Sequence, residues 1–334
     1  MGTVNRSELI DTQGRVVRDL RISVTDRCNL RCVYCMPAEG MPWLSKDLIL
    51  TYEEIVRLSR ISLDLGVTGI RLTGGEPTVR ADLPVLVRML SELRPGLDLS
   101  LTTNALKLAA MAGELKAAGL TRVNVSLDTL DRERFHRIAR RDRLADVLAG
   151  LDVSRAVGFS PIKVNAVLMR GFNEDEAVPL AGWGRDQGYE VRFIEWMPLD
   201  FQHGWSREQL VPAAEILRAI DAVYPLEPAR ATDPSAPATL YRYRDGRGTV
   251  GVIASVTRPF CGHCDRIRLT ADGQIRTCLF ALEELDLRAA LRGGASDETI
   301  ADLLRAAVWR KKPGHLINSP YFRQPERGMS AIGG

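Results

Sequence analysis

Short apolar stretches alternate with longer amphipathic stretches between residue 19 and about residue 196. The apolar stretches predict six strands, at residues 20–24, 69–73, 97–103, 122–127, 162–168 and 191–195. The amphipathic stretches predict helices over residues 51–65, 83–93, 106–118, 131–157 (with an interruption) and 174–187. This alternation indicates an α/β fold with a parallel sheet and right-handed crossovers. By itself it fits a doubly wound sheet and a full or partial β/α barrel equally well.

Polar residues follow the predicted strands, and their placement favours the barrel. In β/α barrels the working groups come from the carboxyl ends of several strands. Here the strand ends carry Thr73-Gly74-Gly75-Glu76, Thr102-Thr103-Asn104, Ser126-Leu127-Asp128, Asn165 and Glu195-Trp196-Met197. We therefore expect a functional site at one end of a barrel.

The chain beyond this repeat has a different pattern. Residues 225–237 are rich in Pro, Ala, Ser and Asp and predict a linker or a long crossing loop. Strands are predicted at residues 241–243 and 248–253 and a helix at residues 297–309, before a polar tail that ends in Gly333-Gly334. We expect two parts, residues 1–224 and residues 225–334.

Composition and charge narrow the function classes. The chain has 334 residues, of which 45% are hydrophobic and 26% charged, as in ordinary globular proteins. No apolar run approaches the roughly 18 residues of a membrane span, and residues 1–11 lack the apolar core of a signal peptide. We expect a cytoplasmic protein with no membrane partner. The net charge of +3 is too small to indicate nucleic-acid binding.

The six cysteines form two triplets, Cys28/Cys32/Cys35 and Cys261/Cys264/Cys278. Disulfides are not expected in a reducing compartment, and two odd-numbered groups pair badly as local bridges. Metal ligation is the better interpretation. Zinc with a fourth ligand from elsewhere is one alternative, and a cluster that leaves one iron open is the other. His263 stands between two cysteines and is expected to point away from the metal.

The spacing Cys28-x3-Cys32-x2-Cys35, with Tyr34 before the last cysteine and Gly74-Gly75-Glu76-Pro77 after the second strand, resembles the radical S-adenosylmethionine (SAM) superfamily. The resemblance implies a partial (β/α)6 TIM-type barrel with a smaller C-terminal iron–sulfur domain. It also implies a 4Fe–4S cluster on the three cysteines, with SAM on the open iron, and cleavage of SAM to a 5′-deoxyadenosyl radical. The cofactor then supplies the chemistry and the protein the placement.

The second triplet lies in Phe260-Cys-Gly-His-Cys-Asp-Arg-Ile-Arg and resembles the GTP 3′,8-cyclase family of molybdenum-cofactor biosynthesis over nearly the whole chain. This resemblance implies a second 4Fe–4S cluster. It also implies conversion of GTP into (8S)-3′,8-cyclo-7,8-dihydroguanosine 5′-triphosphate, by removal of a hydrogen from the ribose C3′ and bonding of that carbon to C8.

The resemblance also implies roles for individual residues. Cys28, Cys32 and Cys35 would hold the SAM-side cluster, and Cys261, Cys264 and Cys278 the GTP-side cluster. SAM would contact Tyr34, Gly75, Ser126 and Met197, while GTP would contact Arg21, Arg71, Thr102, Lys163, Arg266, Ile267 and Arg268, with Arg192 as a further phosphate contact. The catalytic tail would be Gly333-Gly334. Independently, Arg266 and Arg268 share one face if their segment is a strand, and arginines suit phosphate.

Two alternatives remain at this point. One is a radical SAM enzyme that modifies peptides with an auxiliary cluster, although such proteins usually carry more C-terminal cysteines. The other is a non-enzymatic iron–sulfur or zinc protein. For the cyclase, the expected partners are an electron donor and a downstream molybdopterin-pathway enzyme, and a homodimer is possible.

Overall fold

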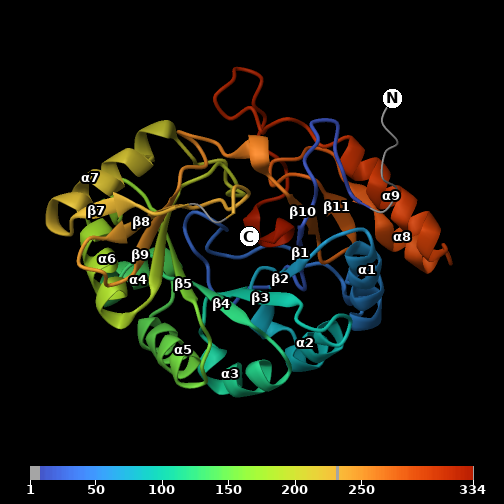
Figure 1. Ribbon diagram of the computed structural model, residues 1–334, viewed down its shortest axis with the longest axis horizontal. Helices are drawn as coiled ribbons and strands as arrows, with labels where there is room; N and C mark the ends of the chain where they lie inside the picture. Colours follow the sequence, from blue (N-terminus) through green and yellow to red (C-terminus); the bar gives the residue numbers. More distant parts are fainter. Residues whose placement is uncertain (1–7, 231–232, 334) are drawn as a thin grey trace.

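Among residues 8–230 and 233–333, which a computed structural model describes, twelve strands form one curved sheet (Figure 1). The six strands expected in the first part form its parallel middle and pair in chain order. They are β1 (Asp19–Ser23), β2 (Gly69–Thr73), β3 (Asp98–Thr103), β4 (Arg122–Ser126), β5 (Ile162–Leu168) and β6 (Glu190–Glu195). The partial barrel is therefore confirmed.

The helices between these strands cover the outer, convex face of the sheet (Figure 1). They are α1 (Tyr52–Asp64), α2 (Leu83–Ser91), α3 (Leu108–Ala117), α4 (Arg132–Ala139), α5 (Leu144–Ala156) and α6 (Ala177–Gln187). The interruption expected within residues 131–157 separates α4 from α5. The apolar residues of the strands and helices join in one large core. The concave face is left for polar side chains.

The C-terminal part extends both edges of the same sheet. On one side β10 (Arg266–Leu269) pairs parallel with β1, followed by β11 (Gln274–Arg276) and β12 (Leu285–Asp286). On the other side β9 (Thr249–Ile253) pairs parallel with β6, followed by β8 (Thr239–Tyr243) and β7 (Leu226–Pro228). Thus the expected linker contains an edge strand, and helix α7 (Ala213–Val223) precedes it. The boundary at residue 225 stays a prediction.

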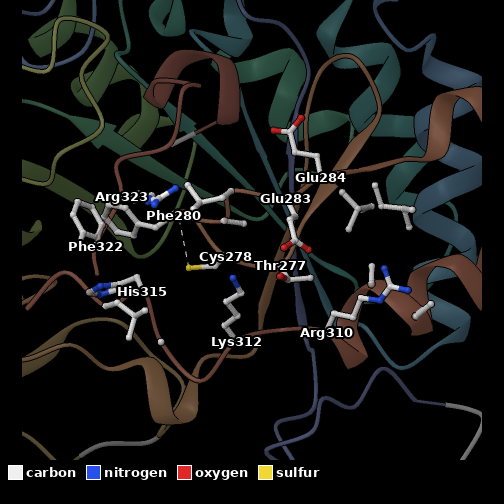
Figure 2. A pocket seen from close by; sticks show the side chains of 18 of the residues that line it. Thr277, Cys278, Phe280, Glu283, Glu284, Arg310, Lys312, His315, Phe322 and Arg323 are labelled. Atoms are coloured by element: carbon white, nitrogen blue, oxygen red, sulfur yellow. Dashed lines mark hydrogen bonds between the residues drawn. The ribbon is translucent and has the colours of Figure 1, made fainter. Parts of the chain in front are cut away.

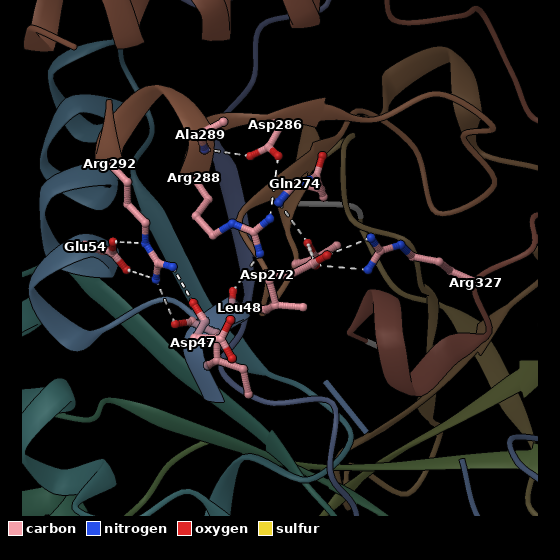
Figure 3. Close-up of polar contacts among 12 residues, drawn as sticks. Asp47, Leu48, Glu54, Asp272, Gln274, Asp286, Arg288, Ala289, Arg292 and Arg327 are labelled. Carbon is pink, nitrogen blue, oxygen red and sulfur yellow. Dashed lines mark hydrogen bonds and ion pairs between the residues drawn. The ribbon is translucent and has the colours of Figure 1, made fainter. Parts of the chain in front are cut away.

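Arginines fasten the C-terminal helices to the barrel (Figure 3). In α8 (Leu287–Arg292), Arg292 Nε donates to Glu54 Oε1 of α1 at 2.7 Å. In α9 (Asp297–Trp309), the carboxylate of Asp297 pairs with Arg57 of α1 at 2.8 Å. The contacts hold α8 and α9 beside β11, the strand that leads to Cys278 of the second triplet. No helix in the described part of the chain has the length and apolar character that a bilayer crossing requires.

Helix α1 begins with the capping box that the sequence predicts. The Thr51 hydroxyl accepts from the Glu54 amide at 3.2 Å, and Glu54 Oε2 accepts from the Thr51 amide at 2.8 Å. Thr51→Ala removes the first of these bonds. We expect it to lower the free energy of unfolding by about 1 kcal/mol in denaturant titrations. Thr51→Ser keeps the hydroxyl and is the control; an equal loss in both variants would contradict this account.

Candidate functional site

The first cysteine loop follows β1 and is bonded to the glycine turn that follows β2. The amide of Gly75 donates to the carbonyl of Thr25 at 2.8 Å, and the amide of Glu76 donates to that of Arg27 at 2.8 Å. A Cβ atom on Gly75 would lie 2.4 Å from the carbonyl oxygen of Asp26. Only glycine allows this approach. The two segments therefore form one rigid unit at the carboxyl edge of the sheet.

Glu76 anchors the ends of β2 and β3 from a buried position. Its Oε1 accepts from the Thr78 amide at 3.0 Å and from the Thr103 hydroxyl at 2.7 Å, and its Oε2 accepts from the Asn104 amide at 2.6 Å. Burial raises the pKa of this carboxyl group, and these donors oppose the shift. Both carboxylate oxygens of Glu76 already accept hydrogen bonds. The main-chain carbonyls of the glycine turn are therefore the better acceptors for a ligand amine.

Tyr34 is oriented by Asp128, one of the polar residues that the sequence places at a strand end. Its hydroxyl donates to Asp128 Oδ2 at 2.8 Å, and the amide of Val167 donates to Asp128 Oδ1 at 2.8 Å. Burial raises the pKa of Asp128 to about 6. Asp128 follows β4 directly, so the available indication was a carboxylate at a strand end.

The sulfur atoms of both triplets have hydrogen-bond donors, which suits thiolate ligands. The amides of Leu30 and Phe280 lie 3.4 Å from the sulfurs of Cys28 and Cys278, respectively. All six cysteines are free of disulfides. Burial raises the pKa of Cys28 to about 11, so metal binding there would release a proton.

Within the described residues, no three His, Cys, Asp or Glu side chains gather as ligands of a single metal ion. A cubane is bound differently, because each cysteine takes a separate iron. The donors around the sulfurs and the cavity beside the second triplet are the features that fit clusters.

A cavity of about 190 Å³ lies on the concave face of the sheet and is shared by the barrel and the C-terminal part. Its walls carry basic, amide and sulfur groups: Arg21, Arg71, Thr102, Asn124, Asn165, Arg192, Met197, Cys261, Cys264, Arg266, Arg268, Cys278 and Met329. The second triplet thus faces the arginines directly. Seven of the residues predicted to bind SAM or GTP meet here.

Strand register places three of these arginines in one row. Arg21 of β1 is the partner of Arg71 on β2 and of Arg268 on β10. Like charges opposite one another in a sheet destabilise it. Asp19 compensates only in part, since its oxygens lie 3.8 Å from Arg21 Nε and 3.8 Å from an Arg71 amino nitrogen. Burial and the neighbouring Arg266 lower the pKa of Arg268 to about 10, which leaves the guanidinium charged at neutral pH.

Two guanidinium nitrogens in the cavity lack hydrogen bonds. Arg21 Nε and one terminal nitrogen of Arg266 are buried and find no hydrogen-bond partner among residues 8–230 and 233–333. A buried donor without a partner costs about 1–3 kcal/mol. An anion with several oxygen atoms would satisfy these donors and relieve the row of positive charges.

The second triplet is surrounded by positive charge. Cys261 begins a short 3-10 helix, Cys261–His263, and His263 is exposed. Burial would raise the pKa of Cys264, but the charges of Arg266 and Lys311 lower it to about 7. Lys311 was not selected from the sequence. Only the fold brings it to Cys264, because the two residues are far apart in the chain.

The C-terminal tail enters the barrel (Figure 1). Arg327 holds it in place by donating to both oxygens of Asp272 at 3.0 and 2.8 Å (Figure 3). Helix α10 (Met329–Ile332) follows, and the carbonyl of Gly333 accepts from Arg268. Gly333 has φ +89°, and a Cβ atom there would lie 2.9 Å from the Cβ of Ser23. Gly334 lies outside the described residues.

Lys163, Ser126 and Ile267 are also predicted site residues, but they are not among the residues that line this cavity. Lys163 is on the face of β5 that also carries Asn165 of the cavity, and Ser126 pairs with Asn165 at the end of β4. The side chain of Ile267 faces away from the cavity. Its side chain is buried in the hydrophobic core, because strand alternation turns it away from the face of Arg266 and Arg268. Only its main chain could contact a ligand in the cavity.

A second cavity of about 240 Å³ lies beside the second triplet (Figure 2). Cys278, Phe280 and His315 line both cavities, so they form the wall between the two. Glu283, Glu284, Arg310, Lys312 and Arg323 line the second cavity alone. Its mixed charges do not form a site for a polyanion.

Comparison with known proteins decides the family. The Radical SAM superfamily model matches residues 22–183, and the Molybdenum Cofactor Synthesis C model matches residues 189–317. A GTP 3′,8-cyclase of Streptomyces coelicolor is 56% identical over 328 residues, covering 98% of this chain and 96% of that protein. GTP 3′,8-cyclase 2 of Mycobacterium tuberculosis is 52% identical over 331 residues, covering 98% and 92%.

The chain belongs to the GTP 3′,8-cyclase family. It is thus a radical SAM enzyme of molybdenum-cofactor synthesis, and membership of this superfamily implies SAM and a 4Fe–4S cluster. Among solved structures, Streptococcus suis SuiB bound to the precursor peptide SuiA has a TM-score of 0.64. It is 16% identical and covers 93% of this chain and 76% of that one. This likeness shows the fold that GTP 3′,8-cyclases share with SuiB.

The contact between Gly75 and the cysteine loop leads to a prediction. In Gly75→Ala the added Cβ would collide with the Asp26 carbonyl, so we expect a loss of about 1–3 kcal/mol in the free energy of unfolding. Less iron should be retained after anaerobic reconstitution, because the loop is displaced. Gly113→Ala is the control, since nothing lies within 4 Å of its Cβ position on α3. Wild-type stability and iron content in Gly75→Ala would refute the prediction.

Proposed function

We propose that this protein converts GTP into (8S)-3′,8-cyclo-7,8-dihydroguanosine 5′-triphosphate. The observation that carries the proposal is the row of Arg71, Arg21 and Arg268, which lines a cavity that the second cysteine triplet also lines. A nucleoside triphosphate supplies the several negative charges that such a row requires. Its base would then occupy the end of the cavity that faces the cysteines.

The two triplets would hold two 4Fe–4S clusters. Cys28, Cys32 and Cys35 would hold the first, and Cys261, Cys264 and Cys278 the second. When bound, the first cluster and SAM would supply the radical chemistry, directed at the hydrogen on C3′ of GTP. The chain itself positions the ligands and excludes water from the cavity.

The residues proposed for SAM lie around the first cysteine loop. The turn at Gly75 is held against this loop, and Tyr34 is fixed by its bond to Asp128. Ser126 ends β4, and Met197 lines the cavity that would hold GTP. Such an arrangement would place SAM over the carboxyl edge of the strands, with GTP deeper in the barrel.

Basic side chains from several strands would bind the triphosphate. Arg266 and Arg192 join the row from β10 and β6, and Thr102 adds a hydroxyl from β3. The main chain of Ile267 would complete the set. Each donor comes from a different strand or register position, so the phosphates would be fixed in one orientation.

The tail would complete the site. The bond from Arg268 to the carbonyl of Gly333 joins the tail to the proposed phosphate site, which supports a catalytic role for Gly333-Gly334. An electron donor and a downstream molybdopterin-pathway enzyme are proposed as partners. The cytoplasmic location and the homodimer stay predictions.

The deciding experiment measures 5′-deoxyadenosine. Anaerobically reconstituted protein with SAM and dithionite should form it only when GTP is present, together with a cyclised product by mass spectrometry. Cys28→Ser should abolish both, because the first cluster loses a ligand. Deoxyadenosine formation that ignores GTP would keep the radical SAM chemistry and favour a peptide substrate. Zinc without sulfide in the reconstituted protein would favour the non-enzymatic alternative.

Lys163 gives a pH-dependent prediction for GTP affinity. Burial and the charge of Arg192 lower its pKa to about 8, so its charge is lost as the pH rises through that value. We therefore expect GTP binding, measured by calorimetry, to weaken about tenfold above this pH, since one charge-assisted hydrogen bond is lost. Lys163→Arg stays charged and should show little of this dependence. Identical pH profiles would remove Lys163 from the phosphate site.

A further inference from the structure

A buried lysine lies behind the second cysteine triplet. Lys311 is 3% exposed, and its ammonium donates to the carbonyls of Cys264 at 2.7 Å and Arg266 at 2.8 Å. The same nitrogen lies 3.7 Å from the sulfur of Cys264. No carboxylate oxygen within the described chain comes within 4.0 Å of it. A buried ammonium without a carboxylate is costly unless another negative group compensates it.

The segment that carries the ammonium group is held in place on both sides of Lys311. The amide of Lys311 donates to Val308 at the end of α9, at 2.9 Å. Arg15 fixes the following residues, because its guanidinium donates to the carbonyls of Lys312 at 2.7 Å and Pro313 at 3.1 Å. Arg15 also donates to the carbonyl of Cys261 at 2.7 Å and pairs with Asp11 at 2.6 Å. The segment around Lys311 and the cysteine loop are thereby held together.

Arg15 belongs to a small N-terminal turn closed by the bridge between Ile10 and Val16. Arg15 and its partner Asp11 are both buried. This turn had no assignable role in the sequence. In the folded chain it connects the two segments that carry Cys261 and Lys311.

Cys28 of the first triplet and Cys264 of the second differ in the groups that donate to their sulfurs. The sulfur of Cys28 is approached by neutral groups, the Leu30 amide at 3.4 Å and the side-chain amide of Asn104 at 3.8 Å. The sulfur of Cys264 is approached by a cation. Hydrogen bonds and positive charge at cluster sulfurs stabilise the reduced cluster, which carries one more negative charge, and so raise its reduction potential.

We propose that Lys311 is a positioning residue that raises the reduction potential of a cluster on the second triplet through the sulfur of Cys264, and that Arg15 holds it there. The inference rests on the proposed function, since it needs the second 4Fe–4S cluster. The group on which Lys311 acts is the cluster held by the chain itself, so the proposal requires no other ligand. One chain would then give its two clusters different potentials through the charge of their nearest donors.

The test isolates the second cluster in the full chain. Cys28, Cys32 and Cys35 are replaced by serine together, so that only the second triplet can bind iron. After anaerobic reconstitution, iron and sulfide are counted and the potential is measured by redox titration followed by electron paramagnetic resonance. Lys311→Met in this background should keep the cluster and shift its potential to a more negative value. Lys312→Met is the matched control, because that side chain is exposed and only its main chain contacts Arg15.

Each outcome tests either the presence of the second cluster or the role of Lys311. Lack of iron and sulfide in the parent and in Lys312→Met would overturn the second cluster and, with it, this inference. An intact cluster with the same potential in Lys311→Met and Lys312→Met would overturn the inference alone. If Lys311→Met loses its cluster, Lys311→Gln decides, because it keeps a donor without the charge. A potential more negative than that of the control supports the role of the charge, and an equal potential refutes it.

Discussion

The register of three neighbouring strands is the constraint on which the rest of the site depends. Parallel pairing of β2, β1 and β10 aligns Arg71, Arg21 and Arg268 on the concave face of the sheet. The apolar residues on the other face fix this register, because a slip by one residue would turn them out of the core. The sheet therefore holds a repulsive row of cations in its cavity whose natural counterpart is a polyanion. The stability of the core is what makes this arrangement tolerable.

The same strand, β1, connects the two cysteine triplets, which lie toward its opposite ends. Its carboxyl end leads into the first loop, which the turn at Gly75 holds against β2. Its other neighbour, β10, follows immediately after Cys264, so the second triplet is positioned from the opposite side. The C-terminal part is thus joined to the barrel through main-chain hydrogen bonds. One strand thus connects the first cysteine loop with the cavity that the second triplet lines.

The charged residues around the site are grouped by the sign of their charge. Buried carboxylates such as Glu76 and Asp128 lie at the carboxyl ends of the strands, where they accept from main-chain amides and hydroxyl groups. Arginines and a lysine dominate the other side. The tail, held by Arg327, ends against Arg268. The barrel thus separates buried carboxylates at the carboxyl ends of its strands from the arginines that line its cavity.

The sequence by itself determined the local elements and the chemical groups. The six strands, the cap of α1 at Thr51 and the helix at residues 297–309 follow from hydrophobic period and capping residues, which act over a few positions. Cysteine spacing is equally local. The tertiary structure alone decided that β10 pairs with β1, that Ile267 turns into the core and that Asp128 binds Tyr34. It also brought Lys311 to Cys264. Such contacts depend on strand register and on the path of the chain between distant segments, and local patterns do not encode either one.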